Sequence, residues 1–412
     1  MPISFSIDAF RRVETITEIF RTESKLHGYT SIIPGSVTSY QEITSYYPDA
    51  LRRSVKYTGP DGNIYTVKSD PTHFVTRLAS QNKRTGSLVQ KYAYSTSKLN
   101  WRTNNGHTVE NLQCGLEVYD SDTVLSEAET IRVACRVLEK SGIGKIVIDL
   151  GNTKFTEILL ESCMIEDNTK MKIRNLIDSK NLPELQSLIE STNMPDETKS
   201  AFMILPQLFG PPKATIERAK QIALSEAAQA AIQRVEVLYE SLIDYGFDKS
   251  MIRIDFSFTN TYSYYTSSIY KVYTADSGQV LAAGGRYDNA FGYGLAACGI
   301  ALYLNEINEV IEMKQLKNSN FYTKDFAIYY AKEDRKNAFK LSDLLREMGY
   351  IVTADEQLDF STKSAASDAE EVVRISKGQL EIMNQRMNTF SKSSFEQFIR
   401  KVEDQYVPSS IH

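Results

Sequence analysis

The stretch Ala283-Gly284-Gly285-Arg286-Tyr287-Asp288 carries the most information about the fold of this 412-residue chain. It continues an apolar run that begins at Val280, which predicts a strand leading into the two glycines. The glycines lack the spacing of a dinucleotide-binding fingerprint, and the sequence holds no G-x-x-x-x-G-K-S/T phosphate loop. Taken alone, the glycine pair is therefore typical of a turn at the edge of a sheet.

Three other segments precede this stretch in the chain: Val67-Lys68-Ser69-Asp70-Pro71-Thr72, Gln113-Cys114-Gly115-Leu116-Glu117 and Ser263-Tyr264-Tyr265-Thr266. Each segment alone is compatible with a core strand or a turn. Together with the glycine pair, their order and spacing resemble the histidyl-tRNA synthetase family, where the matching patterns are R-P-E-G-T, Q-x-G-x-E, D-Y-Y-T-G and G-G-R-Y-D. The resemblance covers residues 1 to about 313 and implies a class II synthetase-like antiparallel sheet with flanking helices.

The residues before this point in the chain independently predict hairpins and helices. Residues 6–27 predict an opening helix that ends before Gly28, and residues 88–99 and 109–119 predict a hairpin around a polar loop. The stretch Ser126-Glu127-Ala128-Glu129 has the pattern of a capping box and predicts the start of another helix. Because regular βαβ units are missing, these patterns indicate an α+β fold rather than a doubly wound one.

The second half of the chain predicts an insertion and a further domain. Residues 166–250 are rich in Lys, Glu, Leu and Ala, which predicts a helical insertion with one long helix over 214–245. A helix from about 297 to 313 closes the synthetase-like core, 1–313. Residues 321–412 predict a strand, a helix, a strand and further helices, and so a small C-terminal α/β domain.

Composition narrows the class of protein. The net charge is −5, whereas non-specific nucleic-acid binding needs clustered cations, so nucleic acid is an unlikely partner. The four cysteines are widely spaced without CxxC pairs, which predicts buried free thiols and no metal site. The chain begins without a signal-peptide pattern and has no apolar run of about 18 residues, so we expect a cytoplasmic protein with no membrane contact.

The resemblance also implies a pocket for histidine. An imidazole with both nitrogens engaged requires carboxylate or amide partners, an α-ammonium requires an acceptor, and tyrosines supply flat walls with a polar tip. The positions that match the pocket of the family are Asp70, Thr72, Gln113, Glu117, Tyr264 and Tyr265.

Three positions depart from the pattern of an active synthetase. Formation of an aminoacyl-adenylate places a carboxylate against an ATP phosphate, and cations must stabilise the negative charge that develops. Ungapped counting places Leu99, Asn260 and Glu306 where the family has arginines, although Arg102 lies three residues from Leu99. Loss of one such donor costs about 100- to 1000-fold in rate, so we expect no adenylation and no catalytic residue.

A synthetase fold without this chemistry is similar to the regulatory subunits of ATP phosphoribosyltransferase, whose members often read S-Y-Y-T, as at Ser263. That similarity implies a regulatory subunit with L-histidine as its ligand, no cofactor, and a homodimer that assembles with the short-form catalytic subunit. Two alternatives remain: a divergent histidyl-tRNA synthetase, and a pseudo-synthetase that binds RNA or a protein partner. A basic, aromatic surface on the C-terminal domain would favour the second alternative, but the cations and anions there are mixed and the aromatics scattered.

Overall fold

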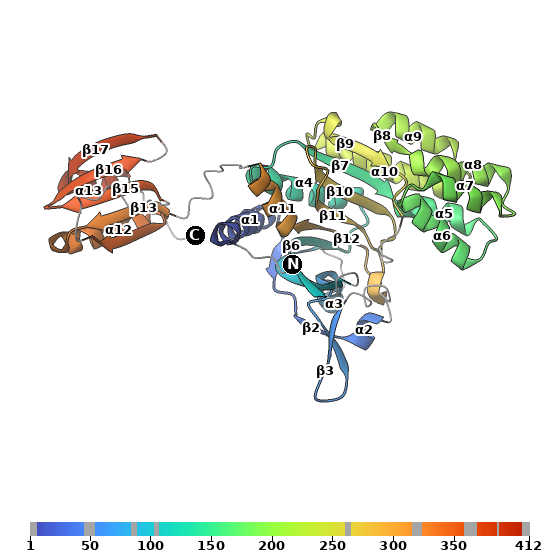
Figure 1. Cartoon of the computed structure of the whole chain (residues 1–412), viewed down its shortest axis with the longest axis horizontal. Helices are drawn as coiled ribbons and strands as arrows, with labels where there is room; N and C mark the ends of the chain where they lie inside the picture. Colours follow the sequence, from blue (N-terminus) through green and yellow to red (C-terminus); the bar gives the residue numbers. More distant parts are fainter. Residues whose placement is uncertain are drawn as a thin grey trace. The chain divides into compact units, whose positions relative to one another are not determined.

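In the computed structural model, the chain forms two compact units, Met1–Leu316 and Lys317–His412 (Figure 1). The structure describes residues 6–44, 54–83, 89–102, 107–259, 265–314, 324–357, 369–384 and 387–405. Of the sequence predictions, those on Asn260, Ser263 and Tyr264 fall outside these residues.

The larger unit is built on a nine-stranded sheet with the order β1-β5-β6-β12-β11-β10-β7-β9-β8. Neighbouring strands are antiparallel except for the parallel pairs β1·β5 and β7·β9. The strands are β1 (Thr30–Ile32), β5 (Gln90–Arg102), β6 (His107–Tyr119), β7 (Ile146–Asn152), β8 (Phe209–Gly210), β9 (Ile252–Asp255), β10 (Ser268–Thr274), β11 (Val280–Arg286) and β12 (Ala297–Tyr303). A separate three-stranded sheet joins β2 (Val37–Ser39), β4 (Ile64–Val67) and β3 (Val55–Thr58). The predicted α+β class with a largely antiparallel sheet is confirmed.

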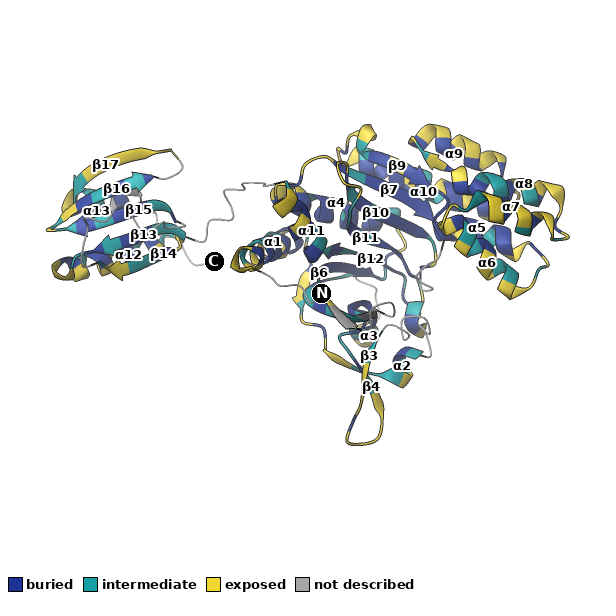
Figure 2. Cartoon of the chain, in the orientation of Figure 1, coloured by how far each residue is buried: buried dark blue, intermediate teal, exposed yellow. Residues whose placement is uncertain are grey.

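Helices cover one face of the nine-stranded sheet. The hydroxyl of Tyr270 on β10 lies 3.1 Å from that of Thr130, and the amide of Asn152 on β7 donates to the carbonyl of Ala231 at 3.1 Å. These contacts place α4 (Val124–Lys140) and α10 (Glu226–Asp244) against that face, and both helices and the strands beneath them are rich in buried residues (Figure 2). Two further helices pack against this sheet, α1 (Ile7–Leu26) and α11 (Leu304–Met313). Side chains that alternate with the core residues point to the opposite face, which carries the candidate site.

The helical insertion is present, but its long helix is divided. The helices in this part are α5 (Thr153–Glu161), α6 (Asp167–Asp178), α7 (Leu182–Glu190), α8 (Asp196–Ile204), α9 (Pro212–Gln221) and α10. The prediction of one helix over 214–245 was wrong because Ser225 adopts an extended backbone and its hydroxyl accepts from the amide of Ala228. An N-cap of this kind starts a new helix at Glu226.

The prediction of a helix over 297–313 was also wrong in its first half. Residues Ala297 to Tyr303 form β12 at the centre of the sheet, and only Leu304–Met313 is helical. A short apolar run that is buried on both faces has no periodicity that separates a strand from a helix. The same strand explains the glycine pair: Gly284 and Gly285 lie within β11 and pair with β12, so the pair is no edge turn.

The capping box expected at Ser126 was misplaced by three residues. Helix α4 begins at Val124 with Thr123 as its N-cap, and no side chain caps it. Instead, the hydroxyl of Ser126 lies 2.6 Å from that of Ser121, while Glu129 forms an ion pair with Lys91 at 2.8 Å. Both groups therefore find tertiary partners that the local pattern could not reveal.

The smaller unit has a five-stranded sheet with the order β14-β13-β15-β16-β17. Its elements are β13 (Lys324–Tyr330), α12 (Arg335–Glu347), β14 (Val352–Glu356), β15 (Ala369–Ser376), β16 (Gln379–Asn384), β17 (Thr389–Ser394) and α13 (Phe395–Gln405). The α/β character is as expected, but where further helices were predicted after β14 the described residues form three strands and one helix.

All four cysteines are buried and free, as predicted. Within the residues described, no helix is both long enough and apolar enough to cross a membrane.

Candidate functional site

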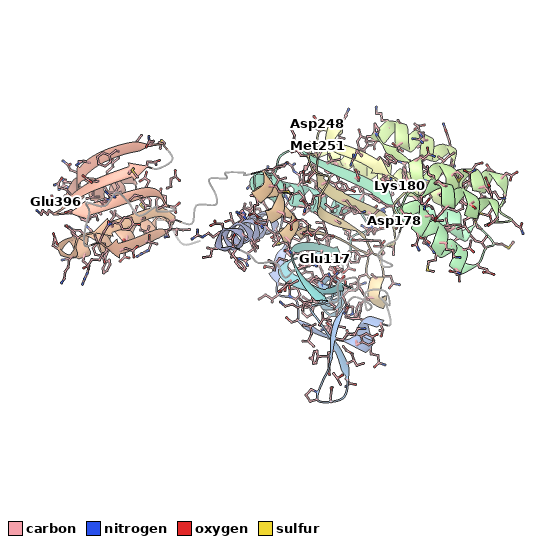
Figure 3. All side chains as sticks on the ribbon, viewed as in Figure 1. Glu117, Asp178, Lys180, Asp248, Met251 and Glu396 are labelled. Carbon is pink, nitrogen blue, oxygen red and sulfur yellow. The ribbon has the colours of Figure 1, made fainter. Side chains whose placement is uncertain are left out.

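The carboxylate of Glu117 is the centre of the candidate site. Glu117 lies on β6 between Tyr92 of β5 and Gly299 of β12, on the face of the sheet opposite α4 and α10. A Cβ atom at Gly299 would lie 2.0 Å from the Glu117 Oε2, so the glycine makes room for this carboxylate. The side chain is only 3% exposed, and Figure 3 shows its place in the sheet of the larger unit.

Three hydroxyl groups surround this carboxylate. Thr72 donates to the Glu117 Oε1 at 3.0 Å and Tyr94 donates to the same oxygen at 3.2 Å, while Tyr287 donates to the Oε2. Burial raises the pKa of Glu117 from an ordinary value of 4.5 to about 8, although these hydroxyl donors act in the opposite direction. A carboxyl group in this environment can bind a proton or a cationic ligand near neutral pH.

Asp70 is placed beside this group by the start of α3 (Pro71–Gln81). Its carboxylate caps the helix by accepting from the amide of Thr72 at 3.0 Å, and Pro71 fills the first helical position. The other carboxylate oxygen forms an ion pair with Lys98 at 3.0 Å, and Lys98 with Thr72 holds the pKa of the buried Asp70 below its usual value. The negative charge of Asp70 is thus already balanced by a cation of the chain.

Gln113 and Tyr265 complete the part of the predicted pocket that the structure describes. Gln113 precedes Glu117 by four residues on β6, so the two side chains share one face of the sheet. Its amide makes no hydrogen bond to any residue within the described ranges, which leaves it available to a ligand. Tyr265 packs its ring against Gly285, where a Cβ atom would lie 2.8 Å from the ring. The structure therefore groups Asp70, Thr72 and Glu117 by direct bonds and places Gln113 on the same face.

The arginine of the glycine-rich stretch has a structural role. Arg286 is fully buried, and its guanidinium donates to Glu127 at 2.7 Å, to Asp288 at 2.8 Å and to the carbonyl of Ser121 at 3.1 Å. Glu127 also forms an ion pair with Arg234 of α10. These bonds connect the end of β11 to the start of α4, and they hold the neighbouring Tyr287 at Glu117.

The positions where synthetases place arginines carry no such cation in the described residues. Leu99 lies on β5, where its backbone amide donates to the carbonyl of Lys68 at 2.8 Å, and Glu306 lies in the first turn of α11. The nearest described cation on β5 with its side chain at the site is Lys98, which Asp70 already pairs. No group of three or more His, Cys, Asp or Glu side chains suited to a metal ion occurs in the described part of the chain.

Comparison with known proteins places this arrangement in a family. The family model described as histidyl-tRNA synthetase matches residues 6–307. The chain belongs to the histidyl-tRNA synthetase family. Within this family, the ATP phosphoribosyltransferase regulatory subunit of Bacillus cereus is 27% identical over 343 residues, which cover 82% of this chain and 81% of that protein.

Solved structures of histidyl-tRNA synthetase-like proteins have the same fold. An ATP phosphoribosyltransferase regulatory subunit/histidyl-tRNA synthetase from Bacillus halodurans has a TM-score of 0.74 and 22% identity, with 89% of this chain and 94% of that chain covered. Histidyl-tRNA synthetase from Nostoc has a TM-score of 0.76 and 14% identity, with coverages of 98% and 100%. A chain of the ATP phosphoribosyl transferase (HisG:HisZ) complex from Thermotoga maritima has a TM-score of 0.54 and 19% identity, with coverages of 71% and 97%.

Sequence reasoning missed three residues of this histidyl-tRNA synthetase-like site. Tyr94 and Tyr287 bind Glu117, and Lys98 binds Asp70. Tyr287 was within the quoted glycine-rich stretch. Tyr94 and Lys98 are four residues apart on β5, so their side chains point to the same face of the sheet. Only the pairing of β5 with β6 reveals that this is the face of Glu117.

Proposed function

We propose that the chain is the non-catalytic regulatory subunit of an ATP phosphoribosyltransferase, the enzyme of the first step of L-histidine biosynthesis. The short-form catalytic subunit joins ATP to phosphoribosyl pyrophosphate and releases pyrophosphate, and this chain supports that activity and transmits inhibition by histidine. It acts in the cytoplasm as a homodimer within a hetero-oligomer. The names of the Bacillus cereus relative and of the Thermotoga maritima complex support this assignment.

One observation carries the proposal: polar side chains cluster around Glu117, while two positions that adenylation fills with cations hold Leu99 and Glu306. Charge that develops on an ATP phosphate needs preorganised donors. Lys98, the cation on β5 that does reach the site, is neutralised by Asp70 at 3.0 Å. A site of this composition favours binding of an amino acid over activation of its carboxylate.

Histidine has chemically matched partners in this pocket. Its imidazole meets the carboxyl group of Glu117, which lies among the hydroxyls of Thr72, Tyr94 and Tyr287. The amide of Gln113, which bonds to no described residue, binds the α-amino or carboxylate group, and Asp70 accepts from the ammonium when Lys98 moves aside. Tyr265, whose ring lies against Gly285, forms a wall.

Two measurements on the purified chain test this function. Exchange of labelled pyrophosphate into ATP, with L-histidine and Mg²⁺ present, should stay at the background rate. Calorimetric titration with L-histidine should show binding that Gln113→Ala weakens by about 10-fold or more, the usual loss for a hydrogen bond to a charged group. Gln113 is the preferred variant because its amide bonds to no other described side chain, so the fold loses little.

A matched control is Glu197→Ala on the exposed surface of α8, which should leave histidine binding unchanged. Pyrophosphate exchange that depends on histidine would show an active synthetase and overturn the proposal. Equal binding by the parent and Gln113→Ala would show that histidine binds elsewhere.

A further inference from the structure

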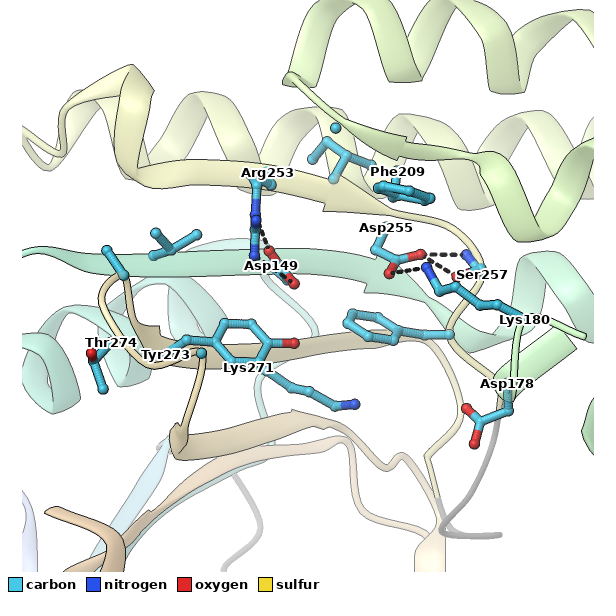
Figure 4. Close-up of a pocket in the computed structure, with 16 residues that line it drawn as sticks. Asp149, Asp178, Lys180, Phe209, Arg253, Asp255, Ser257, Lys271, Tyr273 and Thr274 are labelled. Carbon is cyan, nitrogen blue, oxygen red and sulfur yellow. Dashed lines mark hydrogen bonds and ion pairs between the residues drawn. The ribbon is translucent and has the colours of Figure 1, made fainter. Parts of the chain in front are cut away.

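A second pocket lies on the same face of the sheet as Glu117, where the helical insertion meets strands β7, β9 and β10. Its volume of about 470 Å³ lies within the range of small-molecule sites. Asp149, Arg253 and Lys271 form one rung of the sheet at its floor, and Asp178 and Lys180 enter from the end of α6 (Figure 4).

Two of the three cations in this pocket are already paired. Arg253 donates to both oxygens of Asp149, at 2.8 and 3.4 Å. Lys180 lies 3.5 Å from the carboxylate of Asp255, which also accepts from the amide of Ser257 at 2.8 Å. Within each of these two pairs the positive and negative charges cancel.

The remaining two charges, those of Lys271 and Asp178, form no ion pair with a described residue. The ammonium of Lys271 lies 4.5 Å from the ring centre of Phe258 and forms no ion pair with any residue that the structure describes. Asp178 accepts one hydrogen bond, from the hydroxyl of Thr259 at 3.3 Å, and likewise forms no ion pair within the described ranges. Among the described residues, the pocket thus offers one cation without an ion pair, Lys271 on the sheet side, and one such anion, Asp178 on the side of the insertion.

Aromatic rings form much of the remaining wall. Phe258 and Tyr273 come from the sheet side, and Phe209, which is 53% exposed, comes from β8. Rings of this kind stack on flat or apolar groups. A ligand that satisfies the whole pocket must carry a carboxylate, an ammonium and a flat side chain.

We propose that this pocket is a second ligand site that binds a free aromatic α-amino acid, with histidine counted among them. The ligand carboxylate pairs with Lys271, its ammonium pairs with Asp178, and its ring packs among Phe209, Phe258 and Tyr273. The inference rests on the pocket alone and goes beyond the proposed regulatory function.

The second site is distinct from the Glu117 pocket. Strands β12 and β11 separate β6 from β10, which at about 4.8 Å per strand places the two sites about 14 Å apart. Figure 3 labels Glu117 within the sheet and Asp178 and Lys180 at its junction with the insertion. A variant in one site should therefore leave the other intact.

The test is calorimetric titration of the full-length chain with L-phenylalanine, L-tryptophan and L-histidine, alongside phenethylamine and 3-phenylpropionate. The zwitterions should bind, and the two analogues that lack one charge should bind at least about 10-fold more weakly. Lys271→Met and Asp178→Asn should each weaken the zwitterions by a similar factor, because each removes a charge-assisted contact.

Lys172→Met and Asp196→Asn, both exposed on the insertion and outside the pocket, are the matched controls and should bind like the parent. Glu117→Gln should weaken histidine binding at the Glu117 site and leave binding at the second pocket unchanged. The proposal is overturned if no aromatic amino acid binds more tightly than about 1 mM, or if the Lys271 and Asp178 variants bind like the controls.

Discussion

The buried carboxyl group of Glu117 makes the stability of the larger unit depend on pH in an unusual direction. Its pKa is raised to about 8 in the folded chain, against an ordinary value of 4.5 that applies when the chain unfolds. Between these values the folded state holds a proton that the unfolded state has lost. The free energy of unfolding therefore falls as pH rises through this window.

The size of the effect follows from the two pKa values. One pH unit of proton linkage is worth about 1.4 kcal/mol, so the full window sets an upper limit of about 5 kcal/mol. Between about pH 6 and about pH 8.5 the expected loss is about 2.5 kcal/mol. Glu117→Gln keeps the shape of the side chain and stays neutral at both pH values. Between these two pH values, the free energy of unfolding of Glu117→Gln should fall by about 2.5 kcal/mol less than that of the parent, because all other groups titrate alike in both chains.

Urea unfolding at both pH values measures this difference. The fluorescence of Trp101, the one tryptophan of the chain, reports on the larger unit because the residue lies on β5. A larger loss for the parent than for Glu117→Gln is the expected result. Equal losses would refute the argument, since they would mean that Glu117 is ionised in the fold at neutral pH. A constant difference at both pH values would indicate altered packing without proton linkage.

Three further outcomes follow from the packing around the site. Gly299→Ala should destabilise the chain by about 1–3 kcal/mol in urea unfolding, because the new Cβ would lie 2.5 Å from the carbonyl of Leu116; Gly144→Ala, with open space around it, is the control. Arg286→Met should cost about 3–5 kcal/mol by the same measurement, since it removes the buried guanidinium that pairs with the buried carboxylate of Glu127, and a neutral effect would contradict the buried ion pair. Burial lowers the pKa of His73, so stability should fall as pH drops below about 6.5, and His73→Asn should remove part of that loss; identical acid profiles for the two chains would contradict it.

Much of the fold could be predicted because local sequence patterns mark many of its strands and helix ends. The hairpin of β5 and β6 and the helix that ends before Gly28 follow from alternation and from a glycine with a φ of +78°. The strand at 297–303 could not be predicted, because its small apolar residues are buried at the centre of a sheet whose strand order is non-local. Its assignment depended on pairing with strands far away in the sequence.

The candidate site divides in the same way. Glu117 and Thr72 could be chosen from the sequence because motif spacing identified them, and the structure joins them by a hydrogen bond. Lys98 could not, since its role depends on which face of β5 meets Asp70. The pocket around Lys271 was also beyond the sequence, because its walls come from β8, β9, β10 and the end of α6.

We propose that this chain regulates a transferase and performs no adenylation. The most direct measurement is the rate of pyrophosphate release by a short-form ATP phosphoribosyltransferase, with ATP and phosphoribosyl pyrophosphate, in the presence and absence of this chain. We predict that the chain raises the rate, that L-histidine lowers it again, and that Gln113→Ala weakens the inhibition. A rate that is unchanged by the chain, with or without histidine, would contradict the account.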